Sequence, residues 1–189
     1  MTDPTRSSAD ADLFTPSAAR LATLFYSDLN ELGQFQPVSV EQLPAEFRSL
    51  LAHQDHMTVA LEAFHNSLVN VHPLHEWRDE TSYARCSLLS RQTDGAIVQF
   101  GIMRIWLADL PEPAQQEITG KKTPLGRVLI RHNLLREVEL ITLWQIEPGH
   151  VLRQHLPLSG SAPIYGRSAQ ILVEERPTVQ LLEIVHLAK

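Results

Sequence analysis

YARCSLLSRQTDGAIVQFGIMRI, residues 83–105, is the segment that decides the fold class of this chain. Both halves of the segment are rich in Leu, Ile, Val and aromatic residues, a composition typical of β-strands. Asp94-Gly95 lies between the two halves and favours a tight turn that reverses the chain direction. The segment therefore predicts a β-hairpin of two antiparallel strands.

Four more segments share this β-rich composition, at residues 68–77, 136–148, 165–175 and 177–187. The short sequence EERP, residues 174–177, lies between the last two and indicates a second hairpin. Together with the first hairpin, these segments predict a mostly antiparallel sheet of six strands.

Helices are predicted mainly before the strands. Their expected ranges are 17–29, 44–52, 55–65, 110–120 and 125–132. Asp55 or Thr58 would cap the start of the third helix, and Pro124 would occupy the first position of the last one. Helices followed by a sheet, with a short helical crossover between the third and fourth strands, indicate an α+β domain.

The length of 189 residues suits a single domain, which we expect to span residues 17–189. The first 16 residues are rich in Ser, Thr, Asp and Pro, and we expect them to be disordered. A net charge of −6 disfavours nucleic acid and anionic membranes as partners. Because neither a signal peptide nor an apolar run of membrane-spanning length is recognisable, a cytoplasmic location is expected.

The histidines do not predict a metal site. His53 and His56 are three residues apart, as are His72 and His75, but no HExxH or similar motif is present. We interpret the nine histidines as surface or partly buried residues and expect no bound metal. Cys86 is the only cysteine, which excludes an internal disulfide, and a buried, inert thiol is expected.

Charged residues inside apolar strands are the more informative signal. They are Arg85, Arg104, Arg167 and Glu183. A half-buried sheet exposes one face to water, and charged residues on that face need have no functional role. This interpretation remains open for each of the four residues. Glu183 has apolar neighbours on both sides, so its carboxylate needs a partner, because an unpaired buried charge is costly. The arginines could be that partner, or could bind the carboxylates of a ligand.

The order of several motifs resembles the chorismate pyruvate-lyase family. The motifs span residues 51–186 and read HMTVALEAFH, YARCSLL, VQFGIMRI, KTPLGRVL, YGRSAQI and VQLLEIV. This resemblance implies a six-stranded antiparallel sheet with flanking helices and two helix-turn flaps over an internal pocket. It also implies a carbon–oxygen lyase that eliminates pyruvate from chorismate, leaves 4-hydroxybenzoate and requires no cofactor.

The resemblance also implies roles for individual residues. Arg85 matches the first binding arginine of the family and Glu183 matches the carboxylate near the ring hydroxyl, so these two are the expected catalytic residues. Met57 and Gly101 match positions that line the pocket. The backbone near Leu125, in a flap, is expected to meet a carboxylate of the substrate.

One departure from the family concerns its second arginine. The family has an arginine directly after the glycine that matches Gly101, whereas this chain has Ile102. Arg104 lies two residues further along the same strand and would share the face of Ile102, so it is expected to enter the pocket instead. Arg167 is the other candidate replacement for substrate binding.

Two main functions follow from this reading, and both involve a small aromatic or cyclohexadiene carboxylate. The favoured hypothesis is a chorismate lyase-like enzyme that releases a hydroxybenzoate. The alternative is a non-catalytic domain that binds a small aromatic carboxylate, because the same fold occurs as the effector-binding half of certain bacterial transcription regulators. About fifty residues precede HMT without a basic recognition helix, which argues against a DNA-binding regulator. A third possibility is a partner-binding protein that has lost the pocket. The oligomeric state does not follow from the sequence.

Overall fold

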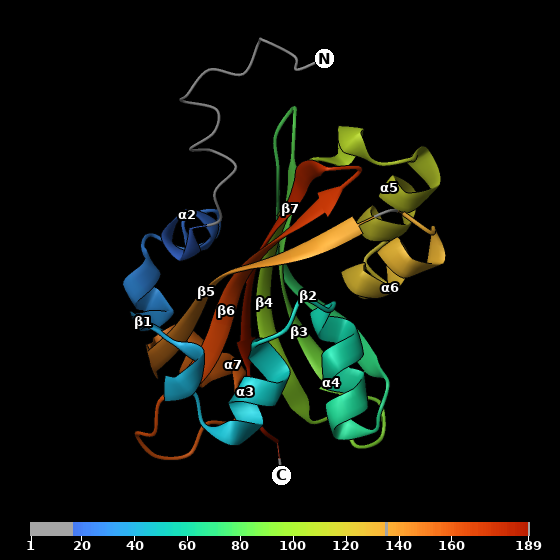
Figure 1. Cartoon of the computed structure of the whole chain (residues 1–189). Helices are drawn as coiled ribbons and strands as arrows, with labels where there is room; N and C mark the ends of the chain where they lie inside the picture. Colours follow the sequence, from blue (N-terminus) through green and yellow to red (C-terminus); the bar gives the residue numbers. More distant parts are fainter. Residues whose placement is uncertain (1–16, 135, 189) are drawn as a thin grey trace.

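A seven-stranded antiparallel sheet forms the centre of the molecule in a computed structural model, which describes residues 17–134 and 136–188 (Figure 1). The strands are β1 (Gly33–Val38), β2 (Val69–Arg78), β3 (Tyr83–Arg91), β4 (Ile97–Ile105), β5 (Arg136–Pro148), β6 (Ile164–Val173) and β7 (Arg176–Val185). Their order across the sheet is β1-β5-β6-β7-β4-β3-β2, and every neighbouring pair is antiparallel. The α+β fold class predicted from the sequence is therefore confirmed.

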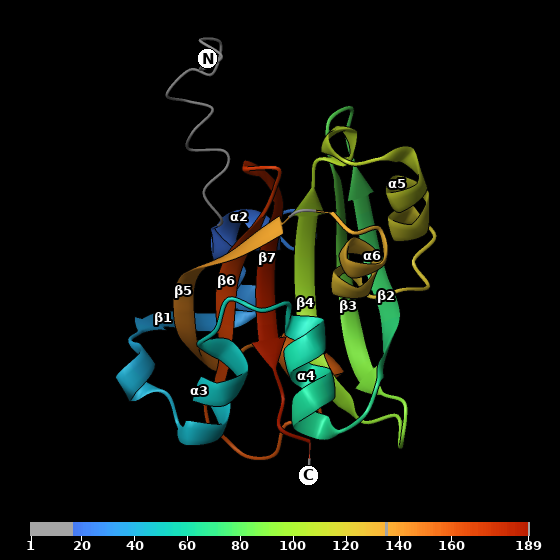
Figure 2. The ribbon, with the colours of Figure 1, turned by 45° about the vertical axis from the view of Figure 1, so that its right-hand side comes forward.

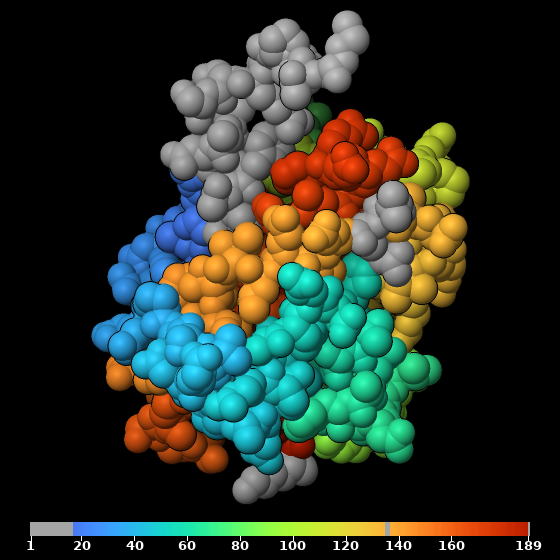
Figure 3. All heavy atoms as spheres, viewed as in Figure 1, coloured from blue at the N-terminus to red at the C-terminus, as the bar shows by residue number. Residues whose placement is uncertain are grey.

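Short helices cover both faces of the sheet (Figures 1 and 2). They are α2 (Ala18–Ala22), α3 (Ala45–Leu51), α4 (Met57–His65), α5 (Glu112–Thr119), α6 (Leu125–Arg131) and α7 (His150–His155). Side chains of α2 and α7 share one core cluster with one face of the sheet. Side chains of α3 and α4, and of α5 and α6, join two clusters on the other face. Figure 3 shows this second face, where α3, α4, β5 and α6 close over the sheet.

The strand count differs from the prediction because β1 was missed. Its sequence, GQFQPV, contains a proline and two exposed glutamines, so it lacks an apolar alternation that would mark a strand. β1 forms because it pairs with the last six residues of β5, from Leu143 to Pro148, at the edge of the sheet. An edge strand is stabilised by backbone pairing with a neighbour, and this leaves little trace in its own sequence.

The two predicted hairpins are present, and their turns differ in length. β3 ends at Arg91 and β4 begins at Ile97, so this connection is longer than the two-residue turn expected from Asp94-Gly95. The Arg91 guanidinium binds the Asp94 carboxylate inside the loop, and Gly95 supplies a positive φ of 74°. The β6–β7 connection is a true two-residue turn, Glu174-Glu175.

The predicted helices are all found, with three corrections at their ends. The helix expected at 17–29 ends at Ala22, because the chain then enters turns. The N-cap of α4 is His56, and neither Asp55 nor Thr58 caps it. Pro124 is the N-cap residue of α6 rather than its first helical residue. The disorder expected for residues 1–16 concerns a segment outside the described residues.

Candidate functional site

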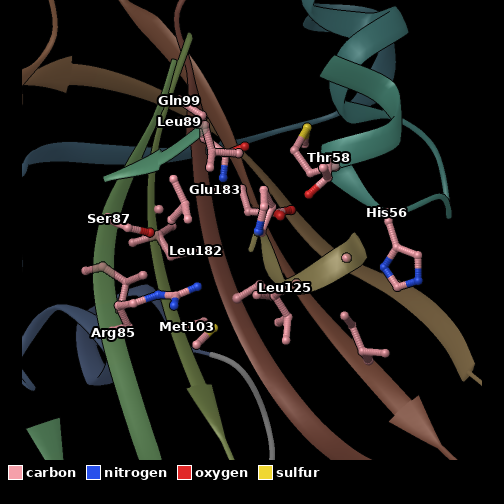
Figure 4. Close-up of a pocket in the computed structure, with 18 of the residues that line it drawn as sticks. His56, Thr58, Arg85, Ser87, Leu89, Gln99, Met103, Leu125, Leu182 and Glu183 are labelled. Atoms are coloured by element: carbon pink, nitrogen blue, oxygen red, sulfur yellow. The ribbon is translucent and has the colours of Figure 1, made fainter. Parts of the chain in front are cut away.

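A cavity of about 60 Å³ lies between the sheet and the start of helices α4 and α6, large enough for several water-sized groups. β3, β4, β6 and β7 supply its floor, and the side chains of Met57, Thr58 and Leu125 lie on the helix side (Figure 4). The segment KTPLGR contributes Pro124, Leu125 and Gly126 to the lining.

Four residues form a row across the floor of the cavity. The strand register places Arg167 beside Glu183, Glu183 beside Gly101, and Gly101 beside Ser87. Directly paired residues on antiparallel strands project to the same face of the sheet, so the row faces the cavity together. Sheet pairing thus brings together residues that are up to 96 positions apart, from Ser87 to Glu183.

Arg85 is a buried cation inside this cavity. Its exposed fraction is 2%, and Figure 4 shows its guanidinium pointing into the pocket toward Met103 and Leu125. Nη1 donates a long hydrogen bond of 3.3 Å to the carbonyl oxygen of Ile118, while Nε has no hydrogen-bond partner in the described part of the chain. No ion pair to Arg85 is formed within residues 17–134 and 136–188. Burial lowers the pKa of Arg85, yet a guanidinium remains charged in proteins.

Arg167 is also buried, with an exposed fraction of 0%, but its hydrogen bonds are satisfied. Nε donates to Glu183 Oε2 at 2.7 Å. Nη1 and Nη2 donate to the carbonyl oxygens of His53 and Asp55, at 2.9 and 3.1 Å. Arg167 therefore neutralises Glu183 and fastens the α3–α4 connection to the sheet.

His53 completes this attachment. Its Nε2 lies 2.7 Å from the carbonyl oxygen of Leu50 and donates to it, because a carbonyl can only accept. Its Nδ1 then accepts from the Asp55 backbone N–H at 3.1 Å and faces Arg167 Nη1 at 3.3 Å. Burial, and then the positive charge of Arg167, lower the pKa of His53. His53 is thereby held neutral, with its proton on Nε2.

Helices α4 and α6 meet closely at the edge of the cavity. A Cβ atom on Gly126 would lie 3.1 Å from Thr58 Oγ1 and 3.2 Å from His56 Cβ. Such distances are tighter than ordinary contacts, so the absence of a side chain at Gly126 allows this approach. α4 is thus packed on α6, the helix that begins in the segment expected to form a flap, beside Met57 and Leu125.

Arg104 does not reach the cavity, contrary to the expectation from strand parity. Its Nε donates to Ser82 Oγ at 3.0 Å, and Nη2 lies 3.6 Å from Asp79 Oδ2. Its guanidinium carbon also lies 5.0 Å from the centre of the Trp106 ring. The parity argument started from Ile102, whose side chain belongs to the core cluster on the opposite face of the sheet. Arg104 shares that orientation.

Of the other predicted site residues, the structure brings six together around the cavity. They are Met57, Arg85, Gly101, Leu125, Arg167 and Glu183. Sequence reasoning missed Ser87, Leu89 and Gln99, which also line it. Gln99 could have been predicted as a lining residue from the sequence, since it is a polar residue two positions before Gly101 in an apolar strand.

The other reactive groups lie apart from this site. Cys86 is fully buried with the opposite core cluster, and burial raises the pKa of its thiol to about 11. In the part of the chain that the structure describes, no group of three or more His, Cys, Asp or Glu side chains is arranged to hold a metal. No helix in that part is long and apolar enough to cross a membrane.

Comparisons with known proteins identify the fold and no family. No protein-family model matches the chain, and no curated protein sequence matches it. PhnF from Mycobacterium smegmatis matches with a TM-score of 0.53 and 10% identity, over 71% of this chain and 64% of PhnF. This chain therefore spans less than two thirds of the length of PhnF.

The effector domain of PhnF gives a more complete match. Its TM-score is also 0.53 at 10% identity, over 80% of this chain and 91% of that domain. The ligand-binding domain of a GntR-family transcriptional regulator from Bordetella bronchiseptica has a TM-score of 0.45 and 11% identity, over 64% and 90% of the two chains. The architecture is compatible with the chorismate lyase-like fold, whereas membership of the lyase family is not shown.

Two expectations from the sequence are corrected by these comparisons. The expectation of a carbon–oxygen lyase is contradicted, because the solved structure that this chain matches over 91% of its length is the effector domain of PhnF, and the comparisons give no evidence of catalysis. Of the two candidates for the second arginine of the lyases, Arg104 lies outside the cavity, and Arg167 lines the cavity but already binds Glu183 and two backbone carbonyl oxygens. The expectation that nucleic acid is not a partner is not supported by the comparisons, because a likeness of fold does not determine the partners of a protein.

Proposed function

We propose that residues 17–189 form a non-catalytic domain that binds a small organic anion, with a carboxylate on an apolar body as the preferred chemistry. The observation that carries this proposal is Arg85, a guanidinium with an exposed fraction of 2% that faces a cavity without an anionic partner among the described residues. Arginine binds carboxylates through two parallel N–H donors, and Nε of Arg85 has no hydrogen-bond partner among the described residues.

The energetics of burial support an external partner for Arg85. A buried charge without a counterion destabilises the fold, so buried charges are normally paired. Arg167 follows that rule through Glu183, and Arg85 does not. A ligand carboxylate would supply the missing negative charge and would accept a hydrogen bond from Nε of Arg85.

The remainder of the cavity suits an apolar body. Leu89, Met103, Leu125 and Leu182 line it, and carbon-rich walls around one charged group are typical of small-molecule sites. The carboxylate of Glu183 would repel an anion, but Arg167 neutralises it at 2.7 Å. The positive charge of Arg85 is therefore the net electrostatic attraction that the site has for an anion.

The shared fold is consistent with this proposal. The solved structure that this chain matches over 91% of its length is named an effector domain. Fold alone does not determine function, so the proposal depends on Arg85 and the cavity rather than on the likeness.

The test is a binding measurement that isolates the charge. Isothermal titration calorimetry with benzoate and with benzyl alcohol compares an anion with a neutral molecule of similar size. We expect the unsubstituted protein to bind benzoate in preference to benzyl alcohol. Arg85→Met should weaken benzoate binding about ten- to a hundredfold, the value of a charge-assisted hydrogen bond of about 1.5–3 kcal/mol.

Arg104→Met is the matched control, because it removes an arginine from a neighbouring strand outside the cavity. It should leave benzoate binding unchanged. Equal weakening by both substitutions would show that overall charge, and not the cavity, governs binding. If a panel of aliphatic and aromatic carboxylates fails to bind the unsubstituted protein, the proposal is wrong.

A further inference from the structure

Gln99 is a second buried polar side chain in the cavity, and its Oε1 atom lacks a hydrogen-bond partner among the described residues. Its exposed fraction is 6%, and the Oε1 atom is itself buried. Gln99 lies on β4, paired with Leu89 on one side and Val185 on the other. Neither neighbour carries a side-chain donor, so a group that hydrogen-bonds to Oε1 has to come from elsewhere.

Gly101 gives the amide of Gln99 its space. The two residues are two positions apart on β4 and therefore face the same side. A Cβ atom on Gly101 would lie 2.9 Å from Gln99 Nε2, a distance that real Cβ contacts do not show. The amide thus lies over the glycine backbone, and both residues line the cavity.

Gln99 and Arg85 lie at opposite ends of the cavity. Arg85 pairs with Met103, which is four residues from Gln99 along β4. At about 3.3 Å per residue, the two positions are separated by about 13 Å along the strand direction. Figure 4 shows the same arrangement, with Glu183 between Arg85 and Gln99. The cavity is therefore elongated, with a cation at one end and an unused hydrogen-bond acceptor at the other.

We infer that Gln99 determines ligand specificity by accepting a hydrogen bond from a hydroxyl or amino group at the end of the ligand remote from its carboxylate. This inference rests on the proposed binding of an anion at Arg85. It narrows the ligand class to elongated carboxylates with a hydrogen-bond donor at the far end. A ligand with a methyl group at that end leaves Oε1 desolvated and unsatisfied.

The experiment compares ligands that differ only at the far end. Benzoate reports binding at Arg85 alone. Two matched pairs of different length follow: 4-hydroxybenzoate with 4-methylbenzoate, and 4-hydroxycinnamate with 4-methylcinnamate. We expect the hydroxyl member of at least one pair to bind about tenfold more tightly than its methyl partner, as expected for one added hydrogen bond.

Gln99→Met keeps the length of the side chain and removes both polar atoms. It should abolish the preference for the hydroxyl ligand over its methyl partner. Gln36→Met, at an exposed position of β1, is the matched control and should retain the preference. Gly101→Ala is a second variant, because its Cβ would displace the flexible amide of Gln99 and should also reduce the preference.

The outcomes separate this inference from the function on which it rests. If benzoate binds through Arg85 and neither pair shows a preference, or the preference survives in Gln99→Met, the role of Gln99 is wrong and anion binding stands. If no carboxylate binds, both proposals are wrong. A thermal unfolding curve for each variant verifies that the protein compared is folded.

Discussion

Arg85 and Arg167 show how two buried arginines of one sheet differ in their surroundings. Arg167 donates to the Glu183 carboxylate and to two backbone carbonyl oxygens, so its charge and its donors are satisfied within the chain. Arg85 has one long hydrogen bond and no carboxylate partner among the described residues. Arg167 stabilises the structure around the cavity, whereas Arg85 is the arginine that we propose binds a ligand.

Arg85→Met is expected to stabilise the protein in the absence of ligand. Methionine has an unbranched apolar side chain that fits beside Met103 and Leu125, and the substitution removes a buried charge without leaving a carboxylate unpaired. We expect the free energy of unfolding to rise by on the order of 1–2 kcal/mol. Urea unfolding followed by circular dichroism measures it. A loss of stability would mean that Arg85 already has an internal partner.

Arg167→Met is expected to do the opposite. It leaves the Glu183 carboxylate buried without its cation and removes the attachment of the α3–α4 connection. Breaking a buried ion pair from one side costs about 3–5 kcal/mol. The same urea experiment should show this loss. The double substitution Arg167→Met with Glu183→Gln should recover part of it, and no recovery would contradict the assigned ion pair.

The turn between β6 and β7 is an unusual sequence for its geometry. Glu174 and Glu175 have φ angles of 51° and 65°, so both lie in the left-handed region. A two-residue hairpin turn with positive φ at both positions favours Asn-Gly, because these residues tolerate that region. The register of β6 against β7 sets this turn length, since Val173 pairs directly with Arg176.

Replacing Glu174-Glu175 with Asn-Gly should therefore stabilise the fold. The left-handed penalty is roughly 1–2 kcal/mol for each ordinary residue, so relief at both positions amounts to about 2–4 kcal/mol at most. The measurement is the urea unfolding midpoint of Glu174→Asn/Glu175→Gly. Glu46→Gln, at an exposed position in the first turn of α3, removes a carboxylate with no backbone change and serves as the control. An unchanged midpoint in the double variant would show that the glutamates are not strained there.

The helices that cover the sheet explain why Arg104 was misassigned. Side chains alternate between the two faces of a strand, so the prediction that Ile102 and Arg104 share a face is correct. The alternation does not indicate which face of the strand adjoins the cavity. In the structure, Gln99, Gly101 and Met103 line the cavity. The face is decided by which helices cover the sheet, and that information lies outside the strand.

The molecule as a whole should lose stability in mildly acidic solution. His53, His65, His155 and His186 all have a lowered pKa, and burial is the largest cause in each case. As pH falls below the ordinary histidine pKa of about 6.5, the unfolded chain binds protons at these positions before the folded chain does. Protonation therefore favours unfolding.

We expect the free energy of unfolding to decrease between pH 7.5 and pH 5.5, since this is the window in which unfolded histidines titrate. Urea unfolding at half-unit pH intervals measures the slope. His53→Gln should reduce the slope relative to the unsubstituted chain. A free energy of unfolding that stays constant or rises toward pH 5.5 would contradict the lowered pKa values.

The sequence alone determined the local structure of most of this protein. Runs of Val, Ile and Leu with turn residues between them predicted six of the seven strands, and helical spacing predicted α3 to α6 to within a few residues. These features succeed because they depend on local backbone preferences and on the alternation of apolar side chains. β1 escaped prediction because its pairing partner, β5, lies about 110 residues away along the chain.

Only the tertiary structure decided which charges are satisfied and which face the cavity. Arg85, Arg104 and Arg167 are each a single arginine within an apolar strand in the sequence. In the fold, Arg167 meets Glu183, Arg104 meets Asp79, and Arg85 meets no carboxylate among the described residues. The physical reason is that burial and pairing depend on neighbours brought together by sheet register and by the helices above it, and these neighbours are distant in sequence.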